Sequence, residues 1–84
     1  MNNQTEPYRR ARVADLAAQQ TDNRAELEAR HGRVWTTTEL RQEFEVTGFM
    51  APYVVVRSKA SGAIGSMEFQ HEPRYYFNWV EESP

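Results

Sequence analysis

The sequence predicts an α+β fold, in which one or two N-terminal helices and a short helix precede a meander of three or four antiparallel strands. Apolar residues before residue 32 recur at three- and four-residue spacings, which is the helical period. Between Tyr53 and Trp79 they alternate instead around two turn signals, which is the period of a strand. With 84 residues the chain has room for one small core, so we expect a single domain.

The N-terminal third predicts a tail and two helices. Residues 1–6 are polar and aperiodic, which indicates a disordered tail before a domain over residues 7–84 with a compact part at about 24–81. A helical face follows, and Thr21 to Asn23 interrupt it with residues that favour helix N-caps. We therefore expect a break near Thr21, a second helix from about Arg24 to His31, and a stop at Gly32. The residues at helical spacing are Tyr8, Val13, Leu16, Ala17, Gln20, Arg24, Leu27 and His31.

The middle of the chain predicts a short helix and the first strand. Thr36 and Glu39 have the spacing of a capping box directly before Leu40, which indicates a helix that ends at about Glu43. From Phe44 onward apolar and polar residues alternate as in a strand. Proline cannot donate to a strand ladder, so Ala51 and Pro52 predict a bend before the next strand.

Two hairpins complete the predicted meander. A two-residue loop at Ser61 and Gly62 would pair Val56 with Met67 and Val54 with Phe69. A three-residue loop at residues 72–74 would pair Phe69 with Phe77 and Met67 with Trp79, and we prefer it to a two-residue loop that pairs Phe69 with Tyr76. One face of the sheet is then expected to form the core under the helices, and it carries Val54, Val56, Met67, Phe69, Tyr75, Phe77 and Trp79.

The opposite face supplies the candidate binding residues. It would combine aromatic planes with hydrogen-bonding groups able to dock a peptide or stack bases, namely Tyr53, Arg57, Gln70, Tyr76 and Asn78. The alternative interpretation is an ordinary wetted face, since tyrosine favours strands. In the adjacent loop, His71 and Arg74 beside Glu72 and Glu68 suggest cation binding or proton transfer, or simply a solvated loop.

Composition limits the possible functions. The chain has no cysteine, no Gly-x-Ser-x-Gly elbow and no phosphate-binding glycine loop, so we expect neither an enzyme nor a metal or cofactor. Residues 34–84 contain four basic and seven acidic residues, which counts against a duplex-binding protein. Without an apolar segment of membrane-spanning length or a secretory signal, we expect a cytoplasmic protein.

The sequence thus predicts a non-enzymatic binding module for a protein or single-stranded nucleic acid, with two alternatives. Three helices at about 26–32, 37–44 and 50–60 with a hairpin wing would give a winged helix that binds DNA. Pro52 and the valines at 54–56 oppose a helix there. A structural domain that dimerises through edge strands is the other alternative.

One further pattern joins these elements. It consists of Trp35, Thr37-Thr38-Glu39-Leu40, Phe44-Glu45-Val46, Ala51-Pro52-Tyr53-Val54-Val55-Val56 and Phe69-Gln70-His71-Glu72-Pro73-Arg74-Tyr75-Tyr76-Phe77. In this pattern the chain resembles a group of small bacterial and phage-associated proteins. The resemblance implies no activity, cofactor, partner or site residue.

Overall fold

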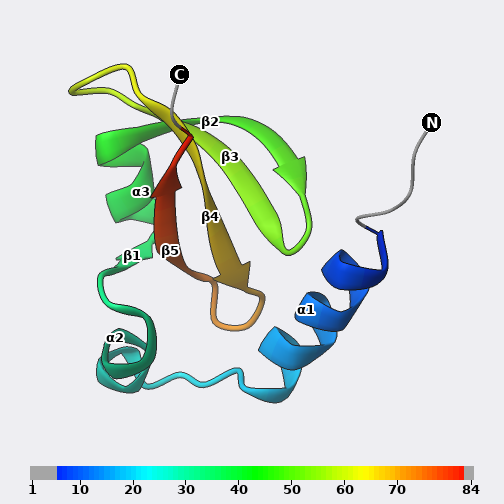
Figure 1. The fold of residues 1–84 in the computed structure, drawn as a ribbon. Coiled ribbons are helices and arrows are strands. Elements are labelled where there is room, and N and C mark those ends of the chain that lie inside the picture. Colours follow the sequence, from blue (N-terminus) through cyan, green and yellow to red (C-terminus); the bar gives the residue numbers. More distant parts are fainter. Residues whose placement is uncertain (1–5, 83–84) are drawn as a thin grey trace.

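The computed structural model describes residues 6–82, which form three helices and one five-stranded antiparallel sheet (Figure 1). The helices are α1 (Glu6–Ala18), α2 (Arg24–His31) and α3 (Thr37–Glu43). The strands are β1 (Val34–Thr36), β2 (Phe44–Met50), β3 (Tyr53–Ser58), β4 (Ile64–Gln70) and β5 (Tyr75–Glu81). They lie in the order β1-β5-β4-β3-β2, so β1 and β2 form the edges.

This architecture confirms the predicted α+β class and adds one strand. The meander β2 to β5 was expected, whereas β1 was not. This strand has only three residues between Arg33 and the predicted helix, which is too short for an alternating pattern to show in the sequence. Trp35 of β1 pairs with Tyr76 of β5. Of the predicted tail, residues 1–5 lie outside the described residues, and Glu6 already begins α1.

The helix boundaries follow the predicted capping residues. The Asn23 side chain accepts a hydrogen bond from the Glu26 backbone N–H at the start of α2. Gly32 ends that helix at φ 85°, a conformation that glycine adopts at no steric cost. Thr36 and Glu39 form the complete capping box of α3. The helix ends therefore lie where the local sequence signals placed them.

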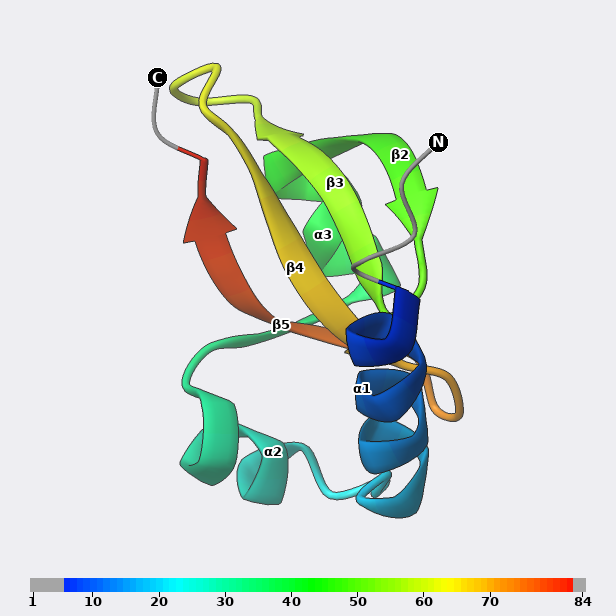
Figure 2. The same cartoon turned by 45° about the vertical axis from the view of Figure 1, so that its right-hand side comes forward.

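Helices pack on both faces of the sheet, and α1 covers only one end of its face (Figure 2). The α3 face, behind the sheet in that view, carries the larger core: Trp35, Leu40, Phe44, Val54, Val56, Met67, Phe69 and Tyr76, with Trp79 packed against them. The α1 face, in front, carries a smaller core under α1 and α2: Leu16, Leu27, Val34 and Phe77, with Tyr75. The prediction of a single apolar face is therefore wrong.

The first predicted hairpin register is wrong by two residues. Val54 pairs with Met67 and Val56 with Gly65, and five residues, 59–63, connect the two strands instead of two. Gly62 takes φ 78° in this loop, and its N–H donates to the Ser58 carbonyl at 2.8 Å. Because side chains alternate with a period of two, the shift leaves each side chain on its predicted face.

The second hairpin uses both registers that were considered: the discarded one holds near the turn, and the preferred one holds beyond a bulge, where Ser66 pairs with Val80 and Gly65 with Glu81. Phe69 pairs with Tyr76, and a bulge then inserts an extra residue of β5 opposite Met67. Asn78 lies in this bulge at φ 58°. As a result Tyr76 and Trp79 both contribute to the α3-face core, while Phe77 lies between Leu16 and Leu27 in the other core.

The winged-helix alternative is not adopted. Residues 50–60, which would have to form its recognition helix, contain the β2–β3 turn and the whole of β3. Within residues 6–82, every helix falls short of the length and apolar character needed to cross a membrane.

Gly65 provides a test of the β4–β5 packing. A Cβ atom at this position would lie 2.2 Å from the Val80 carbonyl oxygen and 2.7 Å from the Trp79 ring. We expect Gly65→Ala to lower the free energy of unfolding by about 1–3 kcal/mol in urea denaturation. Gly48→Ala is the matched control, since its Cβ would contact Val55 at an ordinary 3.5 Å. Equal losses in both variants would contradict the packing described here.

Candidate binding pocket

The structure separates the predicted binding residues into two groups. Gln70, His71 and Arg74 come together at the end of the sheet that faces α1. Tyr53 and Arg57 lie apart from them on the α1 face, and the exposed Arg57 guanidinium is paired with Glu45. Tyr76 is only 5% exposed and belongs to the α3-face core. The predicted open face shared by Tyr53, Gln70 and Tyr76 is therefore not formed.

The α1 helix covers part of that face through an ion pair with β4. The Glu68 carboxylate accepts hydrogen bonds from Arg12 Nε at 2.7 Å and Nη2 at 2.8 Å. It also accepts one from the Asn78 side-chain amide at 2.7 Å. The exposed fraction of the Glu68 side chain is only 11%, and that of the Arg12 side chain is 31%. A partly desolvated, bidentate pair of this kind holds α1 in one register on the sheet.

Titration behaviour around this pair follows from the same contacts. Burial acts to raise the pKa of Glu68, but the hydrogen bonds from Arg12 and Asn78 outweigh it and the net pKa is lowered. His31 stacks on Phe77 with ring centroids 4.3 Å apart. Burial, and then the charge of Arg12, lower the pKa of His31. The Asn78 side-chain nitrogen lies 3.3 Å from His31 Nδ1, and a neutral imidazole could accept a hydrogen bond from it there.

Two glutamines connect the α1–α2 loop to the β4–β5 loop. Gln20 Oε1 accepts hydrogen bonds from the backbone N–H groups of His71 at 3.0 Å and Glu72 at 2.8 Å. The Gln70 side chain, 3% exposed, donates to the carbonyls of Thr21 and Pro73 and accepts from the Thr21 N–H. The Gln70 side chain therefore has a structural role, since its hydrogen bonds join the two loops. Together with those of Gln20 they hold the loop that carries His71 and Arg74 in place.

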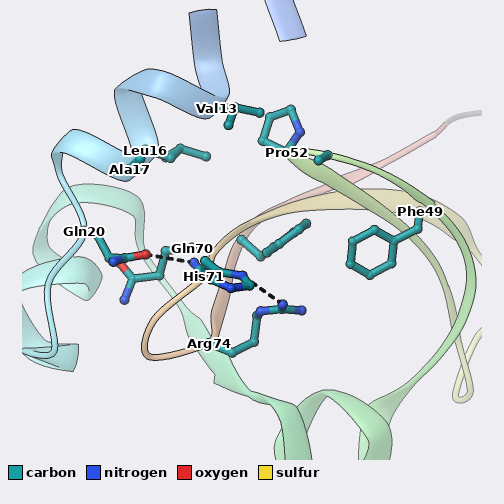
Figure 3. A pocket seen from close by; sticks show the side chains of 11 residues that line it. Val13, Leu16, Ala17, Gln20, Phe49, Pro52, Gln70, His71 and Arg74 are labelled. Atoms are coloured by element: carbon teal, nitrogen blue, oxygen red, sulfur yellow. Dashed lines mark hydrogen bonds between the residues drawn. The ribbon is translucent and has the colours of Figure 1, made fainter. Parts of the chain in front are cut away.

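A largely apolar pocket of about 370 Å³ lies between α1, the β2–β3 turn and the β4–β5 loop (Figure 3). Its walls come from segments far apart in the sequence: Val13, Leu16 and Ala17 of α1; Phe49, Ala51 and Pro52; and Phe69, Gln70, His71 and Arg74, with Gln20. Phe49 is 59% exposed and contacts the edge of the Phe69 ring at a centroid distance of 5.1 Å. Such a volume suits a single side chain or a small apolar group.

Arg74 is the charged group of this pocket. Its guanidinium lies over the Phe69 ring at 4.6 Å from the ring centroid. Its Nη atoms lie 3.4 Å from the Tyr76 hydroxyl and 3.3 Å from His71 Nδ1, and its buried Nε has no hydrogen-bond partner. Among residues 6–82, no carboxylate forms an ion pair with it. The pocket therefore presents a half-buried cation without a counter-charge.

A second hollow of about 640 Å³ continues from this pocket along the α3 face. It lies between α3 and β2, and the two hollows share Phe49 and Arg74. Val46 of β2, 45% exposed, adds apolar surface to it. Because the two hollows share these two lining residues, we treat them as one surface and call it the Phe49 groove.

Sequence reasoning missed the apolar wall of the pocket. Simple alternation placed Phe49 opposite Phe44 and Val46, but a bulge at Thr47 shifts the register, so Gly48 pairs with Val55 and Phe49 with Val54. Phe44, Val46 and Phe49 of β2 therefore share the α3 face. Two large apolar residues, Phe49 and Met50, directly before the Ala51-Pro52 turn were the available signal.

The hypothesis of a cation site at His71 loses one proposed ligand. Glu68 lies in the Arg12 cluster on the α1 face, and His71 Nδ1 faces Arg74 instead. In the part of the chain that the structure describes, no group of three or more His, Asp or Glu side chains could hold a metal ion.

Comparison of the chain with protein-family models, curated proteins and solved structures finds no match in any of the three. The resemblance to small bacterial and phage-associated proteins stays a prediction.

The Arg12–Glu68 pair yields a pH-dependent prediction. A lowered Glu68 pKa contributes stability that is complete above the unfolded value of 4.5 and is lost as pH falls through the folded value. We expect Glu68→Gln to lower the free energy of unfolding at pH 7 by about 1.5–3 kcal/mol. The variant should also lose less stability than the wild type between pH 5 and 3 in urea denaturation.

Glu45→Gln is the matched control for this experiment. It breaks an exposed pair with Arg57, for which only a small effect is expected. If both variants lost the same stability, the Arg12–Glu68 pair would not be what anchors α1.

Proposed function

We propose that the protein is a non-enzymatic binding module of the cytoplasm, and that its pocket receives an apolar side chain of a protein partner. The observation that carries the proposal is the apolar pocket of about 370 Å³, bordered by the 59% exposed ring of Phe49. An aromatic ring at the rim of an apolar pocket is the usual form of an anchor site in protein recognition.

The surroundings of the pocket support binding over catalysis. Gln20, Gln70, His71 and Arg74 are the polar residues among those that line it, so no carboxylate or hydroxyl nucleophile faces the cavity. His71 is directed toward a guanidinium, which is not the partner of an activated general base.

The burial of Tyr76 favours a protein partner over single-stranded nucleic acid. Strand binding uses several aromatic rings on which successive bases stack. Tyr76 is buried, which leaves Phe49 as the exposed aromatic ring among the residues that line the pocket. The apolar pocket offers instead a surface against which an aliphatic or aromatic side chain of a protein can be buried.

Self-association is the second candidate function. The outer edge of β2 has no neighbour among the described strands, and Val46, Phe49 and Met50 are exposed there. An exposed apolar edge strand can pair with the same strand of another copy. Sedimentation that changes between micromolar and millimolar concentration would support this candidate, and it would be abandoned if the chain stayed monomeric throughout.

The pocket is tested by an amide chemical-shift titration with a neutral, end-capped pentapeptide that has phenylalanine between two glutamines on each side. We expect shifts at Phe49, Phe69 and Arg74, because the phenyl ring enters the pocket that these residues border. Phe49→Ala should weaken binding about fivefold through the loss of one aromatic contact.

Tyr8→Ala is the matched control, since Tyr8 is 79% exposed and lies outside the pocket lining. Shifts centred on Tyr53 and Arg57 would instead place binding on the α1 face. A stronger response to a decamer of thymidylate than to the peptide would favour the nucleic-acid function over the one proposed.

A further inference from the structure

We infer that the Phe49 groove selects an acidic peptide, in which carboxylates flank the apolar residue that enters the pocket. This inference rests on the proposed function and specifies the chemistry of the partner. Its starting point is the distribution of charge along the groove, which differs from that of the remaining surface.

Three cations line the groove without an ion-pair partner among residues 6–82. Arg74 belongs to both hollows, and Arg41 and Lys59 line the hollow beside α3. Glu45 is the acidic residue of the groove lining, and its carboxylate is engaged by Arg57. The groove is therefore positively charged although the whole chain has a net charge of −2.

The environment of Arg74 favours an anionic partner, because the guanidinium contacts no carboxylate within the described residues. A guanidinium presents five N–H donors, and here its contacts within the protein are the Phe69 ring, the Tyr76 hydroxyl and the His71 imidazole, none of which is a carboxylate. Its Nε is removed from water without a hydrogen bond. Partial burial of an unpaired charge is unfavourable, and a carboxylate from a ligand would compensate it.

The cations lie at the junction of the two hollows and beside α3, so the groove places positive charge next to the apolar pocket. Arg74 lies where the pocket meets the second hollow, and Arg41 and Lys59 follow on the α3 side. Lys59 already donates to the Arg41 carbonyl at 2.6 Å, which keeps its ammonium at this end of the groove. An apolar residue in the pocket would then have acidic neighbours within reach of Arg74 and of the cations beside α3.

The test compares three end-capped pentapeptides with a central phenylalanine, flanked on both sides by two glutamates, two glutamines or two lysines. Amide titrations at 20 mM salt should give an affinity at least tenfold higher for the glutamate peptide than for the glutamine peptide. This advantage should fall at 300 mM salt, since exposed charges are screened.

Two substitutions assign the effect to the groove. Arg74→Gln should lose about tenfold in affinity for the glutamate peptide and little for the glutamine peptide. Arg41→Gln removes an exposed cation that makes no ion pair among the described residues. It should also lower the affinity for the glutamate peptide, and it tests the role of charge even if Arg74→Gln disturbs the loop. Arg33→Gln is the matched control, because Arg33 pairs with Glu43 and lies outside the groove lining.

The outcomes separate this inference from the proposed function. Equal affinity for the glutamate and glutamine peptides, with shifts at Phe49 and Phe69, would overturn the acidic selectivity and leave the pocket as a binding site. Absence of shifts with all three peptides would count against the pocket itself. Preference for the lysine peptide would overturn the inference directly.

Discussion

The bidentate contact between Arg12 and Glu68 is the interaction on which the arrangement of this protein depends. It attaches α1, which has Leu16 as its buried apolar residue, to the central strand β4. The same carboxylate accepts a hydrogen bond from Asn78, the residue at positive φ in the β5 bulge. Because one buried acid bonds both partners, the position of α1 and the local geometry of β5 are coupled, and the pocket beside α1 depends on both.

Two bulges decide which side chains form the core and which form the groove. The bulge at Thr47 moves Phe49 onto the α3 face, and the bulge at Asn78 lets Tyr76 and Trp79 share that face. Without them Phe49 would point to the α1 side and Trp79 would leave the core. The extra residue in β2 thus places an exposed aromatic ring beside Phe69, where the proposed partner would bind, and the extra residue in β5 keeps Trp79 in the core.

The groove combines apolar surface and unpaired positive charge in a chain that is otherwise rich in paired charges. Salt bridges such as those of Arg24 and Arg30 occupy exposed helix surfaces, where they contribute little to stability. Arg74 differs because it lies half-buried over an aromatic ring with no carboxylate partner among residues 6–82. Partial burial of an unpaired charge is unfavourable, and this cost is the physical basis of the proposed recognition of an anionic partner.

The sequence by itself determined the α+β class, the helix ends at Asn23, Gly32 and Thr36, and the bend at Pro52, because each depends on contacts within a few residues. It also indicated the loop residues His71 and Arg74 that reach the pocket. Tertiary structure alone decided the strand registers, the burial of Tyr76 and the covering of Gln70 by the α1–α2 loop. These features depend on bulges and on contacts between residues about 50 positions apart, such as Arg12 with Glu68, which a period-two pattern does not encode.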